Sequence, residues 1–239
     1  MTIAEKLQTI AENEQRVFEA GKKAEYDKFW DNYQNYGNRT RYTYGFNTWE
    51  EKCFYPKYDI KPTGRAYAMF ELCTVTDFKQ RLIDCGVILD LSKASDIAYL
   101  FQDCHKISSL PTIDTTSALT LNYVFSKCFA LVEIDKVVLK DNGKQTFNNT
   151  FANCEALQNL TIEGVIGTEM DIHWSTKLSR NSILSILQAC KISVSSITIT
   201  LPIQCIDGAT GTLTLIESDT ELNTAYNNAL ALGYTFTFL

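Results

Sequence analysis

The side chains here with the clearest potential for chemistry are cysteines, histidines and carboxylates. The 239 residues include eight cysteines and two histidines, and no two cysteines stand in a Cys-x-x-Cys spacing. Zinc sites use closely spaced cysteine and histidine ligands, so isolated His105 and His173 predict no metal centre. The chain also lacks a Gly-rich phosphate loop and a Gly-x-Ser-x-Gly elbow. We therefore expect no metal and no cofactor.

Paired carboxylates are the remaining route to catalysis, because two of them flanking a sugar linkage can hydrolyse a glycoside. Acidic residues are common, and their spacing is that of loop residues rather than of residues converging on one cleft. Examples are Asp84, Asp90, Asp96 and Asp103. The sequence predicts no catalytic residue, and a glycan-active enzyme is only a remote alternative.

Three of the cysteines belong to a recurring apolar phrase, Phe-x-x-Cys followed by two aliphatic residues at further steps of three. The copies begin at Phe101, Phe125 and Phe151, and fainter copies stand at Phe70–Cys73 and Leu187–Cys190. A phrase repeating at this period is typical of stacked-repeat proteins. Equivalent positions in successive repeats favour buried free thiols over four disulfides, since a thiol behaves as a small hydrophobe.

The phrase resembles the leucine-rich repeat of BspA-like bacterial surface proteins, over roughly residues 66–200. The whole layout also resembles small repeat proteins encoded in phages and prophages of gut Firmicutes. They too begin with a polar helix, continue through an aromatic segment with a phrase like YDIKP, and close with a helix and a strand. The resemblance implies an α/β fold: a short leucine-rich-repeat solenoid, with a strand and a helical turn per repeat.

Four segments follow from these patterns. We expect an N-terminal helix for oligomerisation or attachment, an aromatic-rich connecting segment, the leucine-rich repeats, and a C-terminal helix-strand cap. In the cap, Asp219 is expected to begin a helix that Gly233 ends, before a closing strand. The segments are residues 1–36, 37–65, 66–200 and 201–239.

The N-terminal segment carries apolar residues at steps of seven, but the pattern fades after about two heptads. One interpretation is a surface helix packed on its own domain; the other is a helix that self-associates or docks into a larger assembly. The aromatic residues that follow favour packing against the first repeat over an interface. The attachment candidates are Ile3, Leu7, Ile10, Val17, Trp30 and Trp49.

Outward side chains of the expected strands form the candidate binding face. They are small hydroxyl, amide and carboxyl groups, which suit weak hydrogen bonding to a partner and equally keep a sheet soluble. The candidates are Glu133, Asp135, Asn159, Thr161, Ser196 and Thr198.

Composition and charge restrict the kinds of partner that this chain is expected to bind. A net charge of −6 argues against general nucleic-acid binding, which needs a basic surface. No apolar run approaches the 18 residues of a membrane span, so no membrane insertion is expected. Residues 2–20 are polar and predict no signal peptide. We therefore expect the protein in a virion, or in the host cytoplasm before assembly.

These observations favour a non-enzymatic structural or interaction protein, a tail or other particle-associated component of a phage or prophage virion. Its repeats would bind a protein partner, a second copy, or a host-surface protein or glycan. The alternative is a bacterial cell-surface adhesion or host-binding module, which predicts export.

Overall fold

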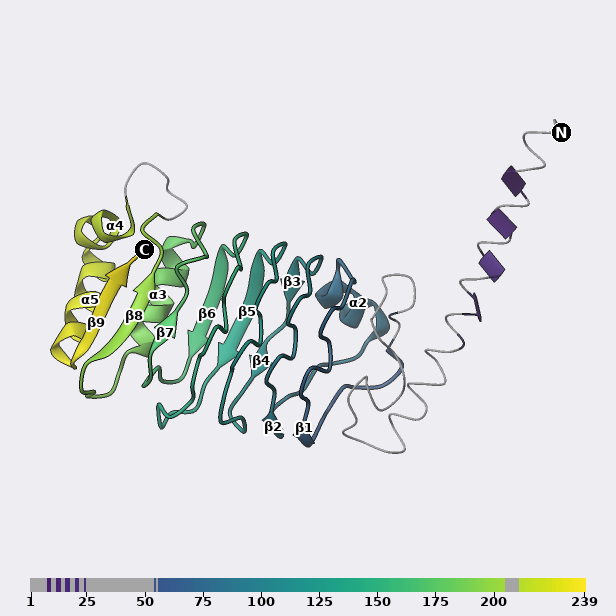
Figure 1. Ribbon diagram of the computed structural model, residues 1–239, viewed down its shortest axis with the longest axis horizontal. Helices are drawn as coiled ribbons and strands as arrows, with labels where there is room; N and C mark the ends of the chain where they lie inside the picture. Colours follow the sequence, from purple (N-terminus) through teal and green to yellow (C-terminus); the bar gives the residue numbers. More distant parts are fainter. Residues whose placement is uncertain are drawn as a thin grey trace.

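Short parallel strands follow one another along the described part of the chain, with helices towards both ends (Figure 1). The computed structural model describes residue 54, residues 56–204 and 211–239, and positions 8, 9, 12, 13, 16, 17, 20, 21 and 24. The fold is mixed α/β. Its strands are β1 (Gly64–Arg65), β2 (Ala94–Asp96), β3 (Ser109–Leu110), β4 (Ile113–Asp114), β5 (Glu133–Val138), β6 (Asn159–Glu163), β7 (Met170–Asp171), β8 (Ile197–Leu201) and β9 (Tyr234–Phe238). Within residues 56–204 and 211–239 its helices are α2 (Phe78–Cys85), α3 (Arg180–Ala189), α4 (Thr212–Ser218) and α5 (Thr220–Ala231).

The strands form three small sheets in which all the pairings are parallel. Strand β1 pairs with β2, strand β5 pairs with β3, β4 and β6, and strand β8 lies between β7 and β9. Parallel neighbours require a crossover connection, so each strand is followed by a full coil of chain before its neighbour. The register is in step from coil to coil, since Ser109 pairs with Glu133, which pairs with Asn159.

The repeated phenylalanines form one continuous stack inside these coils. Phe101 lies 5.2 Å from Phe70 and 6.2 Å from Phe125, measured between ring centroids, and Phe125 lies 5.4 Å from Phe151. Their ring planes differ by 25° or less, and all four rings are buried. The prediction that the repeated rings share one interior is confirmed, including the faint first copy at Phe70.

The repeated cysteines have a specific partner in the neighbouring coil. The Cys104 thiol donates to the Phe70 carbonyl oxygen at 2.9 Å, and Cys128 donates to that of Phe101 at 3.1 Å. Cys154 continues the series at 3.1 Å to Phe125. The thiols of Cys104, Cys128 and Cys154 are free and buried, as expected. Each phrase thus supplies a ring for packing and a sulfur that bonds one coil to the previous one.

The sequence predicts a helical turn at each phrase, and this prediction is wrong in detail, because the chain forms tight turns there. The Cys104 N–H donates to the Phe101 oxygen, the Gln102 N–H to the Tyr99 oxygen, and the Leu100 N–H to the Ile97 oxygen, which makes a run of overlapping tight turns. Tyr99 and Asp103 have φ values of 62° and 58°. Positive φ at the third residue of a turn frees neighbouring N–H groups from helical bonding. Those groups bond instead to the next coil.

The chain folds differently from expectation at Leu187–Cys190. These residues do not form another coil, because they end helix α3 and cap it. Ser179 begins this helix, its hydroxyl accepting a hydrogen bond from the Ser182 N–H. Apolar residues at helical spacing, Ile183 and Ile186, then bury one face, and α3 packs beside β6.

The C-terminal cap agrees closely with its sequence signals. The Asp219 carboxylate accepts from the N–H groups of Glu221 and Leu222, so it begins α5 as predicted. Gly233 follows the helix with a φ of 98°, and β9 runs from Tyr234 to Phe238. At the other end of the stack, the buried ring of Phe54 lies 4.9 Å from that of Phe78.

Candidate binding surface

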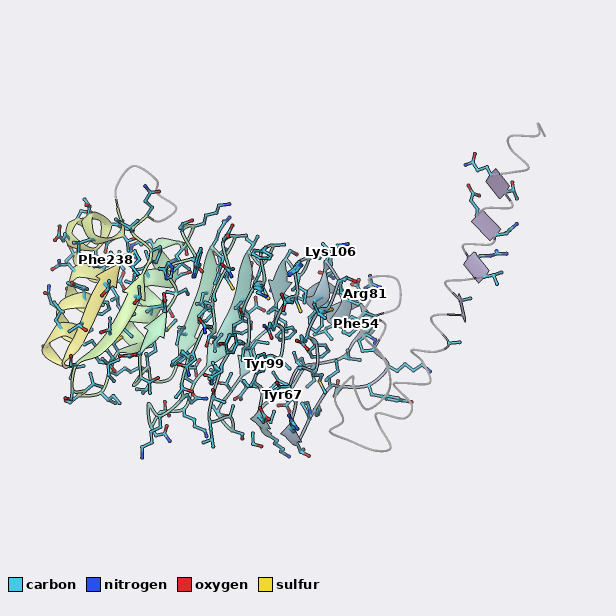
Figure 2. The ribbon with its side chains drawn as sticks, viewed as in Figure 1. Phe54, Tyr67, Arg81, Tyr99, Lys106 and Phe238 are labelled. Carbon is cyan, nitrogen blue, oxygen red and sulfur yellow. The ribbon has the colours of Figure 1, made fainter. Side chains whose placement is uncertain are left out.

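Three tyrosines form a row on the outside of the coils. The rings of Tyr99 and Tyr123 are nearly parallel, with 5.0 Å between centroids and 5° between planes. Tyr67 lies 5.1 Å from Tyr99, and the Arg65 guanidinium lies 4.5 Å above the Tyr67 ring. Figure 2 shows Tyr67 and Tyr99 close together beside the first coils. All three rings are partly exposed, and we call them the tyrosine row.

The turn backbone positions this row. Tyr99 and Tyr123 each stand two residues before a buried phenylalanine and have φ values of 62° and 58°. The Tyr99 N–H donates to the Asn122 oxygen, one residue before Tyr123, so the two rings occupy equivalent places in successive coils. A left-handed backbone costs a non-glycine residue about 1–2 kcal/mol. The coil-to-coil hydrogen bonds hold the rings in place against that cost.

A polar ladder lies next to the row. The Thr146 hydroxyl bonds to the Thr120 hydroxyl at 2.9 Å and to the Asn122 side-chain oxygen at 3.2 Å. The same Asn122 oxygen accepts from the Asn148 N–H at 3.1 Å. These bonds join Thr120 and Asn122 of one coil to Thr146 and Asn148 of the next. They hold the side chains of Thr120, Asn122 and Thr146 in place.

The row ends at a hollow of about 630 Å³, which we call the polar hollow. Tyr123, Phe147 and Met170 form the apolar part of its wall. Coils from Asn148 to Thr200 supply the rest, so residues far apart in the sequence meet there. The polar lining residues are Asn148, Asn149, Glu169, Asp171, Thr198 and Thr200.

One hydrogen-bonded pair at the hollow resembles part of a catalytic site. His173 Nδ1 lies 2.6 Å from Asp171 Oδ1, and the His173 ring lies 4.8 Å from that of Trp174. Carboxylate pairing fixes an imidazole's orientation, but nucleophilic catalysis also needs a hydroxyl or thiol bonded to the ring. Within residues 56–204 and 211–239 the contacts show no such partner on His173.

Four of the predicted strand-face residues lie on the paired strands β5 and β6, where Glu133 is opposite Asn159, and the other two lie at or just before β8. Glu133 and Asp135 lie on β5, but Lys79 of α2 forms ion pairs with both, 3.2 Å from Glu133. The Asp135 carboxylate raises the pKa of the Lys79 ammonium, with a further contribution from Glu133. Both carboxylates thus connect β5 to α2, a use that sequence spacing does not reveal.

The other four candidates lie in three places. Asn159 and Thr161 are exposed on β6, where Thr161 borders a smaller hollow beside Lys136 and Glu163. Ser196 is not on a strand, because it occupies a turn with a φ of 59° before β8 begins at Ile197. Thr198 lies on β8, in a different sheet from β6, and lines the polar hollow.

The attachment candidates fall mostly outside the described residues. Ile3, Leu7, Ile10, Trp30 and Trp49 all lie there. Val17 is described: it is helical and its side chain is 69% exposed. The attachment role therefore stays a prediction.

A second, larger groove of about 830 Å³ lies between α3 and α5. Leu187, Ala225 and Leu232 give it a largely aliphatic lining. Its polar lining residues, which include Gln188, Lys191, Glu221 and Asn228, contribute less of the wall than the apolar ones, whereas specific sites combine an apolar wall with several placed polar groups. The polar hollow fits that description better.

No cluster of three or more histidine, cysteine or acidic side chains arranged for a metal occurs within the described positions. No helix among the residues that the structure describes has the length and apolarity to cross a membrane. Comparisons of the chain with protein-family models, curated proteins and solved structures give no significant match.

Sequence reasoning missed the tyrosine row and most of the polar hollow. One signal was available, because tyrosine precedes the repeated phenylalanine by two residues at Tyr99 and Tyr123, and Asn149 takes that place in the next copy. The coil-to-coil alignment that brings Asp171 beside Thr200 carries no such signal.

Proposed function

We propose that this chain is a non-enzymatic interaction protein, built as a short leucine-rich-repeat solenoid of α/β class, whose coils hold a binding surface rigid. The stacked phenylalanines and the thiol bonds between coils support this architecture. Each coil contacts its neighbours in register, so outward side chains repeat at a fixed spacing. Repeat scaffolds of this kind bind through an extended face.

The tyrosine row is the observation that carries the proposal. Packing alone is served by the buried phenylalanines two residues further on, so the partly exposed rings are not needed for the interior. Tyr99 and Tyr123 also occupy the same left-handed turn position in successive coils, which directs both rings to the same side. Tyrosine offers a large rigid contact area and a polar tip, which makes it frequent in contact surfaces.

The partner we favour is a molecule of a host-cell surface, and the setting is a phage or prophage virion. The resemblance of the layout to phage-encoded repeat proteins supports this setting. Self-association through the N-terminal segment would attach the scaffold to the particle or to a second copy. Finding the chain by mass spectrometry in purified particles would support the setting, and its absence from them would count against it.

Binding to whole cells tests the proposed surface. The probe is a panel of intact gut Firmicutes cells incubated with the labelled full-length chain. Tyr99→Asn with Tyr123→Asn removes both rings and keeps a residue that accepts left-handed backbone, as Asn149 does in the next coil. We expect a loss of binding of about tenfold or more, because aromatic anchors dominate contact surfaces.

Two controls separate the surface from the scaffold. Tyr99→Phe with Tyr123→Phe keeps the rings and should retain most of the binding. Phe129→Leu alters another exposed aromatic, whose ring is 42% exposed, and should have no effect. If the double asparagine variant folds and binds cells as well as the unaltered chain, the tyrosine row is not the binding surface.

A further inference from the structure

The polar hollow has the lining of a site for a neutral, hydroxyl-rich ligand. Its acceptors are the carboxylates of Glu169 and Asp171, and its amides on Asn148 and Asn149 both donate and accept. Threonine hydroxyls on β8 do the same. A sugar ring presents several hydroxyls of mixed donor and acceptor character, and a lining of this kind can pair with many of them.

Tyr123 adds the feature that favours a sugar over other polar ligands. Its ring is the last of the tyrosine row, since the next coil has Asn149 at the equivalent place with a φ of 52°. The row therefore ends in an aromatic residue at the wall of the hollow. An aromatic ring offers an apolar surface against which the C–H face of a pyranose packs, while the polar groups take its hydroxyls.

The charge of the lining disfavours anionic ligands. Glu169 and Asp171 are acidic, and no lysine or arginine is among the described residues that line the hollow. A phosphate, a sulfated sugar or a nucleic acid would meet like charge without a cation to bind it. An apolar peptide would leave several polar groups without partners.

The hollow is also positioned firmly enough to select a ligand. The Thr198 hydroxyl is bonded to the Thr235 hydroxyl at 3.0 Å, and Asp171 Oδ1 accepts from the His173 N–H at 3.1 Å. The Asn148 backbone N–H is bonded to Asn122. Its volume of about 630 Å³ lies within the usual range for small-ligand sites.

We infer that the polar hollow binds a neutral sugar unit of a glycan, with Tyr123 as the stacking platform and Asn148, Asp171 and Thr200 as hydrogen-bonding residues. The inference rests on the proposed function and names its ligand class. The tyrosine row then lies beside the bound sugar unit, where further units of the same glycan would contact it.

An immobilised glycan panel tests this inference with the full-length chain. The panel holds neutral oligosaccharides of glucose, galactose, mannose and N-acetylglucosamine. It also holds sialylated glycans, sulfated glycans and a lysine-rich peptide, which represent the alternative ligand classes. We expect binding to at least one neutral member. Calorimetry on that member should show a loss of about tenfold or more for Tyr123→Asn, and of about two- to tenfold for Thr200→Val, which removes one hydroxyl from an otherwise similar strand residue.

Thr214→Val on α4 is the matched control, because it makes the same change at an exposed threonine that does not line the hollow, and it should bind normally. Circular dichroism confirms that each variant is folded. Binding restricted to sulfated or sialylated members, or to the lysine-rich peptide, overturns the inference. So does binding to no member at all. If cell binding in those cases still depends on Tyr99 and Tyr123, the proposed function stands and only the sugar site is lost.

Discussion

Replacing one ring of the phenylalanine stack gives the sharpest test of the architecture. Phe125 is fully buried and lies between Phe101 and Phe151. Phe125→Ala removes a buried aromatic side chain and leaves a cavity, at a cost of about 3–5 kcal/mol. A domain's whole stability is about 5–15 kcal/mol, so this change should bring the chain close to unfolding.

Urea unfolding followed by far-ultraviolet circular dichroism measures this loss. Phe129→Ala, in the same coil, is the control: its ring is 42% exposed and contacts the ring of His105, so we expect a loss of about 0.5–1 kcal/mol. The double variant of Phe125 and Phe151 should show a coupling energy of about 0.5–1.5 kcal/mol beyond its single changes. Equal losses for Phe125→Ala and Phe129→Ala would refute the continuous interior.

Three further changes probe the turns, the thiols and the cap. Gly164→Ala should lower the free energy of unfolding by about 3–4 kcal/mol, because its φ is +104° and a Cβ there would clash with a backbone oxygen of the neighbouring coil. Gly86→Ala, at a φ of +65° with open space around it, should lower it by about 1 kcal/mol. Thermal unfolding measures both losses. Burial raises the pKa of the Cys104 thiol, so iodoacetamide at pH 8 should label it, by peptide mass mapping, only after urea is added. Hydrogen bonding to Arg180 lowers the pKa of Asp219 to about 2 from its ordinary 3.8, so its stabilising effect is present above pH 4 and is lost as pH falls towards 2. The melting temperature of the unaltered chain should therefore exceed that of Asp219→Asn by an amount that shrinks between pH 5 and pH 2.

Each of these has a clear contrary result. Similar losses for the two glycine variants would mean that the close approach at Gly164 is absent. Rapid labelling of Cys104 without urea would place its thiol outside the interior. A melting-temperature difference that stays constant down to pH 2 would show that the Arg180–Asp219 pair forms equally in the unfolded chain.

The interior was predictable because its signal is local and repeated. Phe101 and Cys104 are three residues apart in one phrase, and the copies at Phe125 and Phe151 repeat both the types and the offsets. The start of α5 at Asp219 and its stop before β9 were predictable for a similar reason, since capping residues act within a few positions of themselves.

The turn conformation was not predictable from composition. Left-handed backbone usually signals itself through glycine or asparagine, yet here tyrosine, aspartate and lysine adopt it at Tyr99, Asp103 and Lys127. Hydrogen bonds to the next coil, such as the Lys127 N–H to the Ala152 oxygen at 2.7 Å, stabilise that choice. Such bonds depend on the stacked neighbour, so one coil read alone predicts a helical turn instead.

The ion pairs on the predicted strand face were not predictable for a different physical reason. Outward alternation on a strand identifies exposed side chains, but it does not tell which exposed charges find partners. Glu133 and Asp135 alternate outward as expected, and both pair with Lys79, a residue more than 50 positions earlier in the chain. The polar hollow depends on equally distant neighbours, since four successive coils supply its walls.

This dependence on several coils links the interior to the binding surface. Tyr123 and Phe125 are two residues apart, so the ring that lines the hollow and the ring that fills the stack share one turn. Loosening the stack must therefore shift the wall of the hollow, although Phe125 does not line it. We expect Phe125→Leu, a milder change than alanine, to weaken ligand binding more than Phe129→Leu at equal folded fraction. Equal binding by these two variants would mean that the hollow keeps its shape without the stack beneath it.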